Sequence, residues 1–194
     1  MNVSITSDSA LIIVDVQVDF CPGGALPVPD GDKIIPFINR YIKIFKENNL
    51  PIIATRDWHP PNHISFKPYG GIWPIHCVQN TPGAAFHPKL KLPNDVIIIS
   101  KATEPNKEAY SGFEGTELSN ILNSKGVRRL FIGGLATDYC VKNTVLDALK
   151  LGFQAFLLLD GTKGVNVNPD DSKKAIEEMV RKGAVAIRIN NILK

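Results

Sequence analysis

F-I-G-G-L-A-T-D-Y-C-V, at residues 131–141, is an apolar run that ends in paired glycines and crosses a short turn. The turn brings Asp138 and Cys140 to the start of an expected helix. Backbone N–H groups at a helix start favour negative charge, so they can stabilise a thiolate or hold an oxyanion. Taken alone, the stretch also fits a small buried cysteine at a strand-to-helix junction, because free cysteine is among the most buried residue types.

Further apolar segments of strand length recur on both sides of this stretch. They are continuously hydrophobic rather than alternating, which is typical of parallel strands covered on both faces. We expect strands at residues 10–16, 52–55, 96–100, 130–133, 155–159 and 185–189, and helices at 33–48, 116–124, 138–151 and 169–182. This alternation predicts a single α/β domain over residues 1–194, a doubly wound three-layer sandwich with right-handed crossovers.

The composition argues against several classes of protein. The 194 residues are 44% hydrophobic and 21% charged, with a net charge of +3, as in an ordinary globular domain. No long run of Lys and Arg indicates nucleic acid binding, and no apolar run approaches the roughly 20 residues of a membrane span. The short polar segment before Ala10 does not resemble a signal peptide. Three cysteines cannot all pair, so we expect free thiols and a cytoplasmic location, and a homo-oligomer remains open.

Two long connections interrupt the alternation, at about residues 56–94 and 101–114. Loops of this length inside a compact domain are usually functional. In an open α/β sheet, ligands bind beyond the carboxyl ends of the strands. Four chemically useful side chains each lie at or just past the end of a different expected strand: Asp15, Asp57, Lys101 and Cys140. The fold should therefore bring these four to one edge of the sheet.

Asp15, Lys101 and Cys140 form a candidate catalytic triad. Asp15 follows the apolar run L-I-I-V, where poor solvation raises a carboxyl pKa and makes the group a better base. Lys101 follows V-I-I-I-S, and its charge would hold the carboxylate ionised and favour a nearby thiolate. Singly, Asp15 could be a cap and Lys101 a solvated loop residue. Together with Cys140 they make a nucleophile with its own proton acceptor and a charge that tunes both.

The first long loop carries a candidate metal site. It contains D-W-H-P-P-N-H at residues 57–63 and W-P-I-H-C at 73–77. One Asp with two or three His suits zinc, iron(II) or manganese and leaves positions open for water or substrate. The Asp-x-His spacing places Asp57 and His59 on the same side of an extended segment. Cys77 is left out, because adjacent residues of an extended chain point apart.

Three aromatic residues near these groups, Phe20, Trp73 and Tyr110, lie in polar loops rich in Gly and Pro. Core packing explains aromatic residues in periodic segments, but these three lie outside such segments. This placement favours a pocket for a flat ligand.

These motifs resemble those of the nicotinamidases (pyrazinamidases), which belong to the isochorismatase-like cysteine hydrolases. The match covers nearly the whole chain in the same order: D-V-Q (15–17), D-F-C-P-G-G (19–24), D-W-H-P-P-N-H (57–63), W-P-I-H-C (73–77), A-Y-S-G-F (109–113) and G-L-A-T-D-Y-C (134–140). It is specific, because the metal loop distinguishes nicotinamidases from relatives that keep only the Asp-Lys-Cys triad.

The resemblance implies a fold, a reaction and catalytic roles. The fold would be a six-stranded, mainly parallel sheet of Rossmann-like topology. The reaction would be hydrolysis of nicotinamide to nicotinate and ammonia through a cysteine thioester, in NAD salvage, with pyrazinamide as a further substrate. Asp15 would be the base, Lys101 the charged helper and Cys140 the nucleophile.

The resemblance also assigns one divalent metal ion, with zinc as the first candidate and iron or manganese as alternatives. Its ligands would be Asp57, His59 and His76, and His63 is a fourth ligand in some members. One departure is Val18, where Asn is common; the change removes an amide that could order metal-bound water.

The remaining implied roles concern the oxyanion and the substrate. The peptide between Leu135 and Ala136 is expected to be cis, which turns the Ala136 N–H toward the oxyanion beside that of Cys140. The substrate-binding residues would be Phe20, Trp73, Tyr110, Leu135 and Ala136.

Two other functions fit parts of the sequence. One is another amidase of the same superfamily, acting on a carbamoyl or ureido substrate, although such relatives generally do without the metal loop. The other is a metal-binding regulatory or scaffold protein on a retired hydrolase fold. That function predicts loss of a triad member, and none is lost here.

Overall fold

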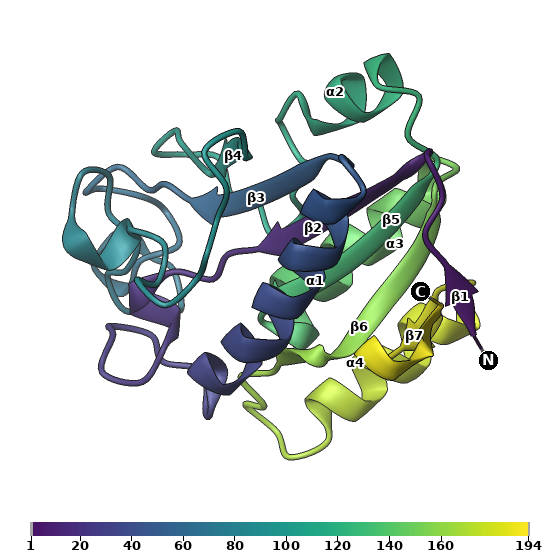
Figure 1. The fold of residues 1–194 in the computed structure, drawn as a ribbon. Coiled ribbons are helices and arrows are strands. Elements are labelled where there is room, and N and C mark those ends of the chain that lie inside the picture. The colour runs from purple at the N-terminus through teal and green to yellow at the C-terminus, as the bar shows by residue number, and fades with distance from the viewer. Residues whose placement is uncertain (1, 194) are drawn as a thin grey trace.

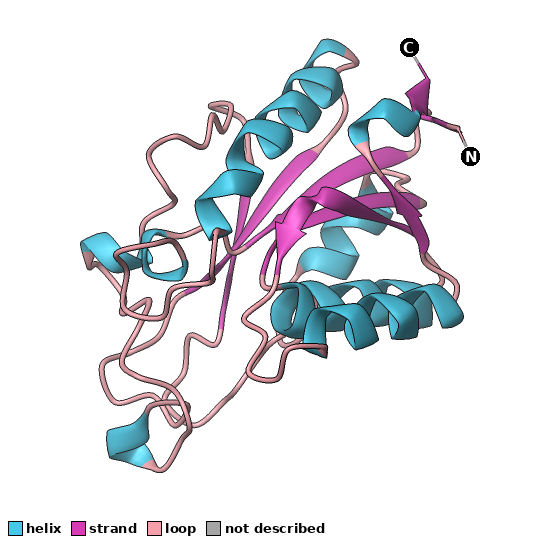
Figure 2. Ribbon diagram, turned by 90° about the horizontal axis from the view of Figure 1, so that it is seen from below, coloured by secondary structure: helices cyan, strands magenta, loops and turns pink. Residues whose placement is uncertain are grey.

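The computed structural model describes residues 2–193 and shows a six-stranded parallel sheet with helices on both faces (Figures 1 and 2). The strand order is β4-β3-β2-β5-β6-β7, and each neighbouring pair is parallel. The strands are β2 (Ser9–Val14), β3 (Ile52–Asp57), β4 (Ile97–Lys101), β5 (Arg129–Leu135), β6 (Gln154–Lys163) and β7 (Val185–Ile187). The predicted doubly wound α/β fold is confirmed.

The central strand β2 shows why the sheet needs two covering layers. Its side chains alternate between two hydrophobic clusters, with Leu11 and Ile13 in one and Ala10, Ile12 and Val14 in the other. The first cluster contains the buried face of α1 (Ile35–Glu47). The second contains buried residues of three helices, α2 (Leu118–Ser124), α3 (Lys142–Lys150) and α4 (Asp171–Arg181). A strand buried on both faces requires an uninterrupted apolar run, as the sequence has.

Two elements differ from the prediction at the edge where the site lies. β2 ends at Val14 rather than Val16, because Asp15 takes a left-handed conformation with φ 50° that Asp tolerates better than most residues. The expected helix from 138 begins instead as a π-helical turn, Thr137–Val141. A wider turn of this kind is frequent at functional sites.

A second, two-stranded sheet was not predicted. It pairs β1 (Val3–Ser4) with β8 (Ile192–Leu193), in parallel, near the two termini (Figure 1). Strands of two residues are too short to show any periodicity in the sequence. Within residues 2–193, no helix is both long and apolar enough to cross a membrane.

The long loops gather at one end of the sheet. Figure 1 shows the teal segments that follow β3 and β4 beyond the carboxyl ends of these strands. The loop after β3 holds only short 3₁₀ turns, Lys67–Tyr69 and Pro82–Ala84. Backbone bonds within the loop hold it together, such as those from the His59 N–H to the Cys77 carbonyl and from the Trp73 N–H to the Ser65 carbonyl.

Candidate active site

Four polar side chains from four different strand ends converge at this edge. Asp15 follows β2, Asp57 ends β3, Lys101 ends β4 and Cys140 lies in the turn after β5. All four are buried, with exposures of 0%, 5%, 1% and 6%. The predicted convergence is therefore present in the structure, and burial on this scale makes each charge felt strongly by the others.

The Lys101 ammonium lies at the centre of this group. Its Nζ is 2.9 Å from Asp15 Oδ2 and 3.4 Å from Cys140 Sγ, and it also contacts Asp57 Oδ1. A further bond goes to the Ala109 carbonyl at 3.2 Å. A buried ammonium is tolerated only where such partners are present. Lys101 thus joins the base and the thiol into one network.

The pKa directions in this network define its resting state. Burial raises the pKa of Asp15, although Lys101 opposes it. Burial would lower the pKa of Lys101, but the Asp15 and Asp57 carboxylates outweigh it and raise that pKa well above its usual value. Burial also raises the pKa of the Cys140 thiol, and the attraction of Lys101 does not compensate. Burial therefore favours the neutral thiol over the thiolate, so a base beside the sulfur is needed to accept its proton.

Asp15, the candidate base, is held by a residue that sequence reasoning missed. The Thr55 hydroxyl donates to Asp15 Oδ1 at 2.6 Å, and this bond lowers the pKa of Asp15 against the effect of burial. Thr55 lies inside β3, two residues before Asp57, so the only signal in the sequence was a polar residue in a buried strand.

Replacing Thr55 with valine removes this bond with little change in shape. The charged form of Asp15 loses stabilisation, so its pKa rises and Asp15 stays protonated up to a higher pH. For the nicotinamide hydrolysis that the resemblance implies, kcat/KM is plotted against pH. We expect the acid limb of this profile to move to higher pH. Thr162→Val is a matched control, since Thr162 bonds to the Gly134 carbonyl instead. An unmoved acid limb in Thr55→Val would contradict this role.

The turn that carries Cys140 needs its glycines and its unusual backbone. Gly134 has φ 129°, and a Cβ there would lie 2.0 Å from the Val14 carbonyl oxygen. The Leu135–Ala136 peptide is cis, as the resemblance implied. The Tyr139 and Val141 N–H groups both donate to the Ala136 carbonyl at 3.1 Å. These contacts hold the backbone on both sides of Cys140 while its side chain faces Lys101.

Asp57, His59 and His76 form a second buried cluster, whose potential ligand atoms all lie within 4.8 Å of one another. The ring Nδ1 of His76 lies 2.8 Å from the Pro74 carbonyl, so it carries the proton and leaves Nε2 with a free lone pair. Burial lowers the pKa of His76, which favours the neutral ring that binds metals.

His59 gives two further observations that fit a metal ion. Its Nδ1 is buried and has no hydrogen-bond partner among the described residues. Its Nε2 lies 3.5 Å from Asp57 Oδ2. Two ligands at about 2.1 Å from one tetrahedral ion lie about 3.4 Å apart, so this spacing suits a shared cation. The donor set of one carboxylate and two imidazoles matches a divalent metal with open positions.

His63 lies beside this cluster without joining it. Its ring centroid is 4.2 Å from that of His59. However, Nδ1 lies 2.7 Å from Ser65 Oγ and Nε2 lies 3.0 Å from the Lys107 carbonyl. Both ring nitrogens are therefore engaged away from the three other groups, and His63 would have to rotate out of these contacts to become a fourth ligand.

Asp57, His59 and His76 are called the metal-type cluster below. Cys140 of the triad and two members of this cluster, Asp57 and His76, line one cavity. It contains about 370 Å³ of space, part of it open to solvent. Its lining residues are Phe20, Leu26, Val28, Asp57, Trp73, His76, Tyr110, Ala136, Tyr139, Cys140 and Val165. Four of the five expected substrate-binding residues are among them. Leu135 is not, because its side chain packs into the apolar core with 1% exposure.

Aromatic contacts shape the mouth of this cavity. The Trp73 indole N–H donates to the Tyr110 hydroxyl at 3.0 Å, and Trp73 packs edge-on against Tyr139 at 5.1 Å between ring centroids. Tyr139 was missed from the sequence, although its place beside Cys140 was a signal. Flat aromatic walls of this kind suit a planar ring.

Gln17 is a second missed residue, and it sets the backbone of Asp57. Its Nε2 donates to the Asp57 carbonyl at 2.8 Å and to the Ala84 carbonyl at 2.9 Å, and its Oε1 accepts from the Asp57 N–H at 2.8 Å. The residue is fully buried. Its place two residues after Asp15 in the D-V-Q motif was the only sequence signal.

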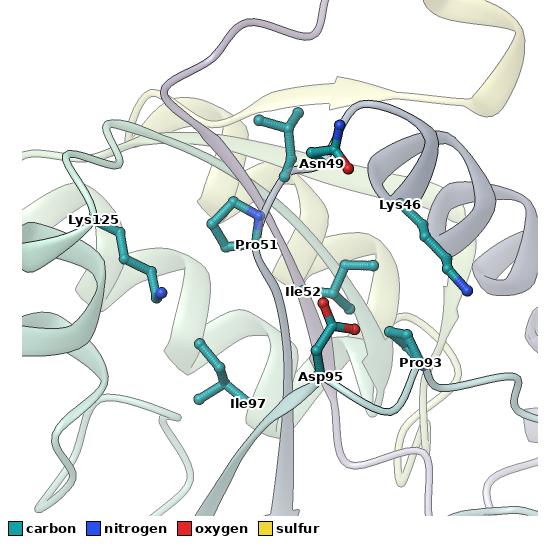
Figure 3. A pocket seen from close by; sticks show the side chains of 9 residues that line it. Lys46, Asn49, Pro51, Ile52, Pro93, Asp95, Ile97 and Lys125 are labelled. Carbon is teal, nitrogen blue, oxygen red and sulfur yellow. The ribbon is translucent and has the colours of Figure 1, made fainter.

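A different hollow lies at the opposite edge of the sheet, near the amino ends of β3 and β4 (Figure 3). Lys46, Asp95 and Lys125 are its charged lining residues. No member of the triad or of the metal-type cluster lines it. The chemistry described here therefore belongs to the carboxyl edge, as expected for an open α/β sheet.

Comparison with known proteins identifies the family. Residues 9–191 match the family described as Isochorismatase domain. The chain belongs to the isochorismatase family. Among proteins of this family, the Escherichia coli (strain K12) nicotinamidase is 41% identical over 196 residues, which cover 90% of this chain and 92% of the relative.

Two solved structures of isochorismatase-family proteins are also similar. The pyrazinamidase of Pyrococcus horikoshii in complex with zinc has a TM-score of 0.90 and 60% identity, covering 94% of this chain and 99% of that one. PnC1 from L. infantum in complex with nicotinate has a TM-score of 0.92 and 36% identity, covering 100% and 99%. The resemblance to nicotinamidases drawn from the motifs is confirmed.

Proposed function

We propose that this protein is a metal-dependent nicotinamidase that hydrolyses nicotinamide to nicotinate and ammonia, and that it also acts on pyrazinamide. The observation that carries this proposal is a small aromatic cavity lined by Cys140 of the buried Asp-Lys-Cys network and by Asp57 and His76 of the metal-type cluster. The names of the relatives from Escherichia coli and Pyrococcus horikoshii support it. The proposal includes a cytoplasmic place in NAD salvage, and the three free cysteines support that location.

In the first half of the reaction, Cys140 attacks the carboxamide carbon while Asp15 accepts the thiol proton. The raised pKa of Asp15 makes it a better base than an ordinary carboxylate. Lys101 stabilises the negative charge as it passes from carboxylate to sulfur. The N–H groups of Ala136 and Cys140 would hold the developing oxyanion.

In the second half, the tetrahedral intermediate collapses and its carbon–nitrogen bond breaks. Asp15 returns the proton to the departing nitrogen, ammonia leaves, and the acyl group remains on Cys140 as a thioester. A water molecule then attacks the thioester carbon and gives a proton to Asp15. As the carbon–sulfur bond breaks, Asp15 gives that proton to the leaving sulfur and restores the thiol, and the nicotinic acid loses its own proton to solvent to leave as nicotinate.

Asp57, His59 and His76 would hold the divalent metal ion, with zinc as the first candidate. When bound, the ion supplies a Lewis acid for the pyridine nitrogen of the substrate, directly or through water. Phe20 and Trp73 would pack on the two faces of the pyridine ring. These contacts place the carboxamide carbon against the sulfur, which lowers the entropic cost of attack.

Incubation with nicotinamide, with and without a chelator, tests the proposal. We expect nicotinate and ammonia in equal amounts, a large loss of rate on chelation, and recovery on adding zinc, iron(II) or manganese back separately. Faster hydrolysis of a carbamoyl or ureido substrate, unaffected by the chelator, would instead identify the other amidase function. A Cys140 thiol that no electrophile labels would point to the regulatory or scaffold function.

A further inference from the structure

The loop that joins β6 to α4, residues 164–170, brings one side chain to the substrate cavity. β6 pairs with β5 up to Lys163 opposite Leu135, so the loop starts beside the turn that carries Cys140. Val165 lines the cavity and packs against the core cluster that contains Phe20 and Val28. The loop therefore forms part of the cavity wall, although it contributes no group to the triad or to the metal-type cluster.

The backbone of this loop is fastened to the nucleophile turn by a buried carboxylate. Asp138 Oδ1 accepts from the Val165 N–H at 2.9 Å, and Asp138 Oδ2 accepts from the Asn166 N–H at 2.7 Å. Asp138 is 7% exposed, so both bonds are shielded from water. Hydrogen bonds to an ionised acceptor are about twice as strong as neutral ones.

The loop is also fixed on its far side. Asn166 adopts φ 52°, and its Oδ1 accepts from the Ser172 N–H at 2.9 Å, in the first turn of α4. A Cβ at Gly164 would lie 1.8 Å from Ser172 Oγ, so the backbone packs directly against this helix. With both neighbours held, the Val165 side chain has little room to retreat from the cavity.

We propose that Val165 is a specificity-determining residue of this site and that Asp138 is its positioning residue. The inference rests on the proposed nicotinamidase function. Leu26, Val28 and Val165 are the aliphatic members of the cavity lining, whereas the other members are catalytic, aromatic or metal-type groups or the Ala136 backbone. A packed aliphatic side chain discriminates ring substituents by volume, and Val165 is the aliphatic member whose own N–H is bonded to Asp138. Because Asp138 is two residues from Cys140, it sets the distance between this wall and the sulfur.

Val165→Ala tests the wall, with Val167→Ala as the matched control. Val167 lies on the same loop but is 65% exposed and outside the cavity lining. The measurement is kcat/KM for 5-methyl- and 6-methylnicotinamide, each divided by that for nicotinamide. Space for one more methylene group in an apolar pocket changes such a ratio about tenfold or more. We therefore expect Val165→Ala to raise at least one of the two ratios by that factor. Val165→Leu should lower both ratios, and Val167→Ala should leave both unchanged.

The same assay distinguishes failure of the proposed function from failure of the Val165 assignment. If wild-type protein does not hydrolyse nicotinamide, the proposed function is wrong. If wild-type protein is active and Val165→Ala and Val165→Leu leave both ratios within about twofold of wild type, only the wall assignment is wrong.

Asp138→Asn tests the positioning role, with Asp147→Asn of α3 as a control that removes one charge from the neighbouring helix. The amide can accept only one of the two N–H bonds, so the loop loosens. We expect KM for nicotinamide to rise much more than kcat falls, and the discrimination against methylated rings to shrink toward that of Val165→Ala. The alkylation rate of Cys140 should stay unchanged, which shows that the nucleophile turn is intact. A lower thermal midpoint with unaltered KM and discrimination would overturn the positioning role.

Discussion

Cys140→Ala lowers the rate of nicotinamide hydrolysis by about 10⁴-fold or more, because the variant has no atom to form the thioester. The substitution does not touch the other contacts of the site. Lys101 keeps both carboxylate partners, and Asp57, His59 and His76 keep their spacing. Metal content and binding of the pyridine ring should therefore stay close to wild type. Ammonia release, bound metal and ligand affinity measured on the same preparation check all three expectations.

Two variants control this result. Cys140→Ser keeps a smaller nucleophile at the same position and should retain far less activity than wild type, since an unactivated hydroxyl is a weak nucleophile. Cys21→Ala removes another buried thiol, whose pKa burial raises to about 11, and should leave turnover near wild type. Turnover by Cys140→Ala near the wild-type value would exclude the covalent route.

Lys101→Met gives the second large effect, and it acts on stability as well as on rate. The change leaves Asp15 and Asp57 buried without their counter-charge. Breaking a buried ion pair in this way costs about 3–5 kcal/mol. We expect the free energy of unfolding at neutral pH to fall by about that amount, and hydrolysis to be lost even under conditions where the variant is folded.

The stability lost in Lys101→Met should depend on pH in a definite direction. In wild-type protein, Lys101 and His59 outweigh burial and hold the pKa of Asp57 well below its usual value. This pair therefore stabilises the fold above the pKa of an unfolded Asp and loses that contribution as the pH falls. The variant lacks the contribution, so its deficit against wild type should shrink in acid. Urea unfolding at several pH values measures the deficit.

Lys142→Met is the matched control for Lys101→Met. Lys142 lies near the surface, 3.8 Å from Glu178, with its side chain 29% exposed. Exposed ion pairs contribute about 0–1 kcal/mol, so this variant should unfold almost as wild type does. An equal loss of stability in both variants would show that the buried network does not have the role assigned to it.

Much of the site could be predicted because its chemistry is attached to strand ends. Asp15 and Lys101 each interrupt or follow an unbroken apolar run, and polar groups at such positions must face the carboxyl edge of a parallel sheet. The second glycine of the pair before Cys140 has a packing reason that only the structure shows, since a Cβ at Gly134 would collide with the Val14 backbone.

Other features depended on contacts between distant segments. Thr55 and Gln17 act on Asp15 and Asp57 through bonds that span 40 residues. Asp57 was assigned to the metal-type cluster alone, yet it also contacts Lys101. The raised pKa of Cys140 follows from burial beside two carboxylates, and no spacing within the motif reports the depth at which a side chain lies.

The sequence by itself determined the alternation of strands and helices and the edge at which they place polar groups, and it marked Cys140 as the candidate nucleophile, because all three follow from pattern and side-chain chemistry. Only the tertiary structure decided that His63 turns toward Ser65 and Lys107, that Leu135 packs into the core, and that Val165 reaches the cavity. Each of these depends on which segments pack side by side, and packing between segments far apart in the chain leaves no periodic signal in either segment.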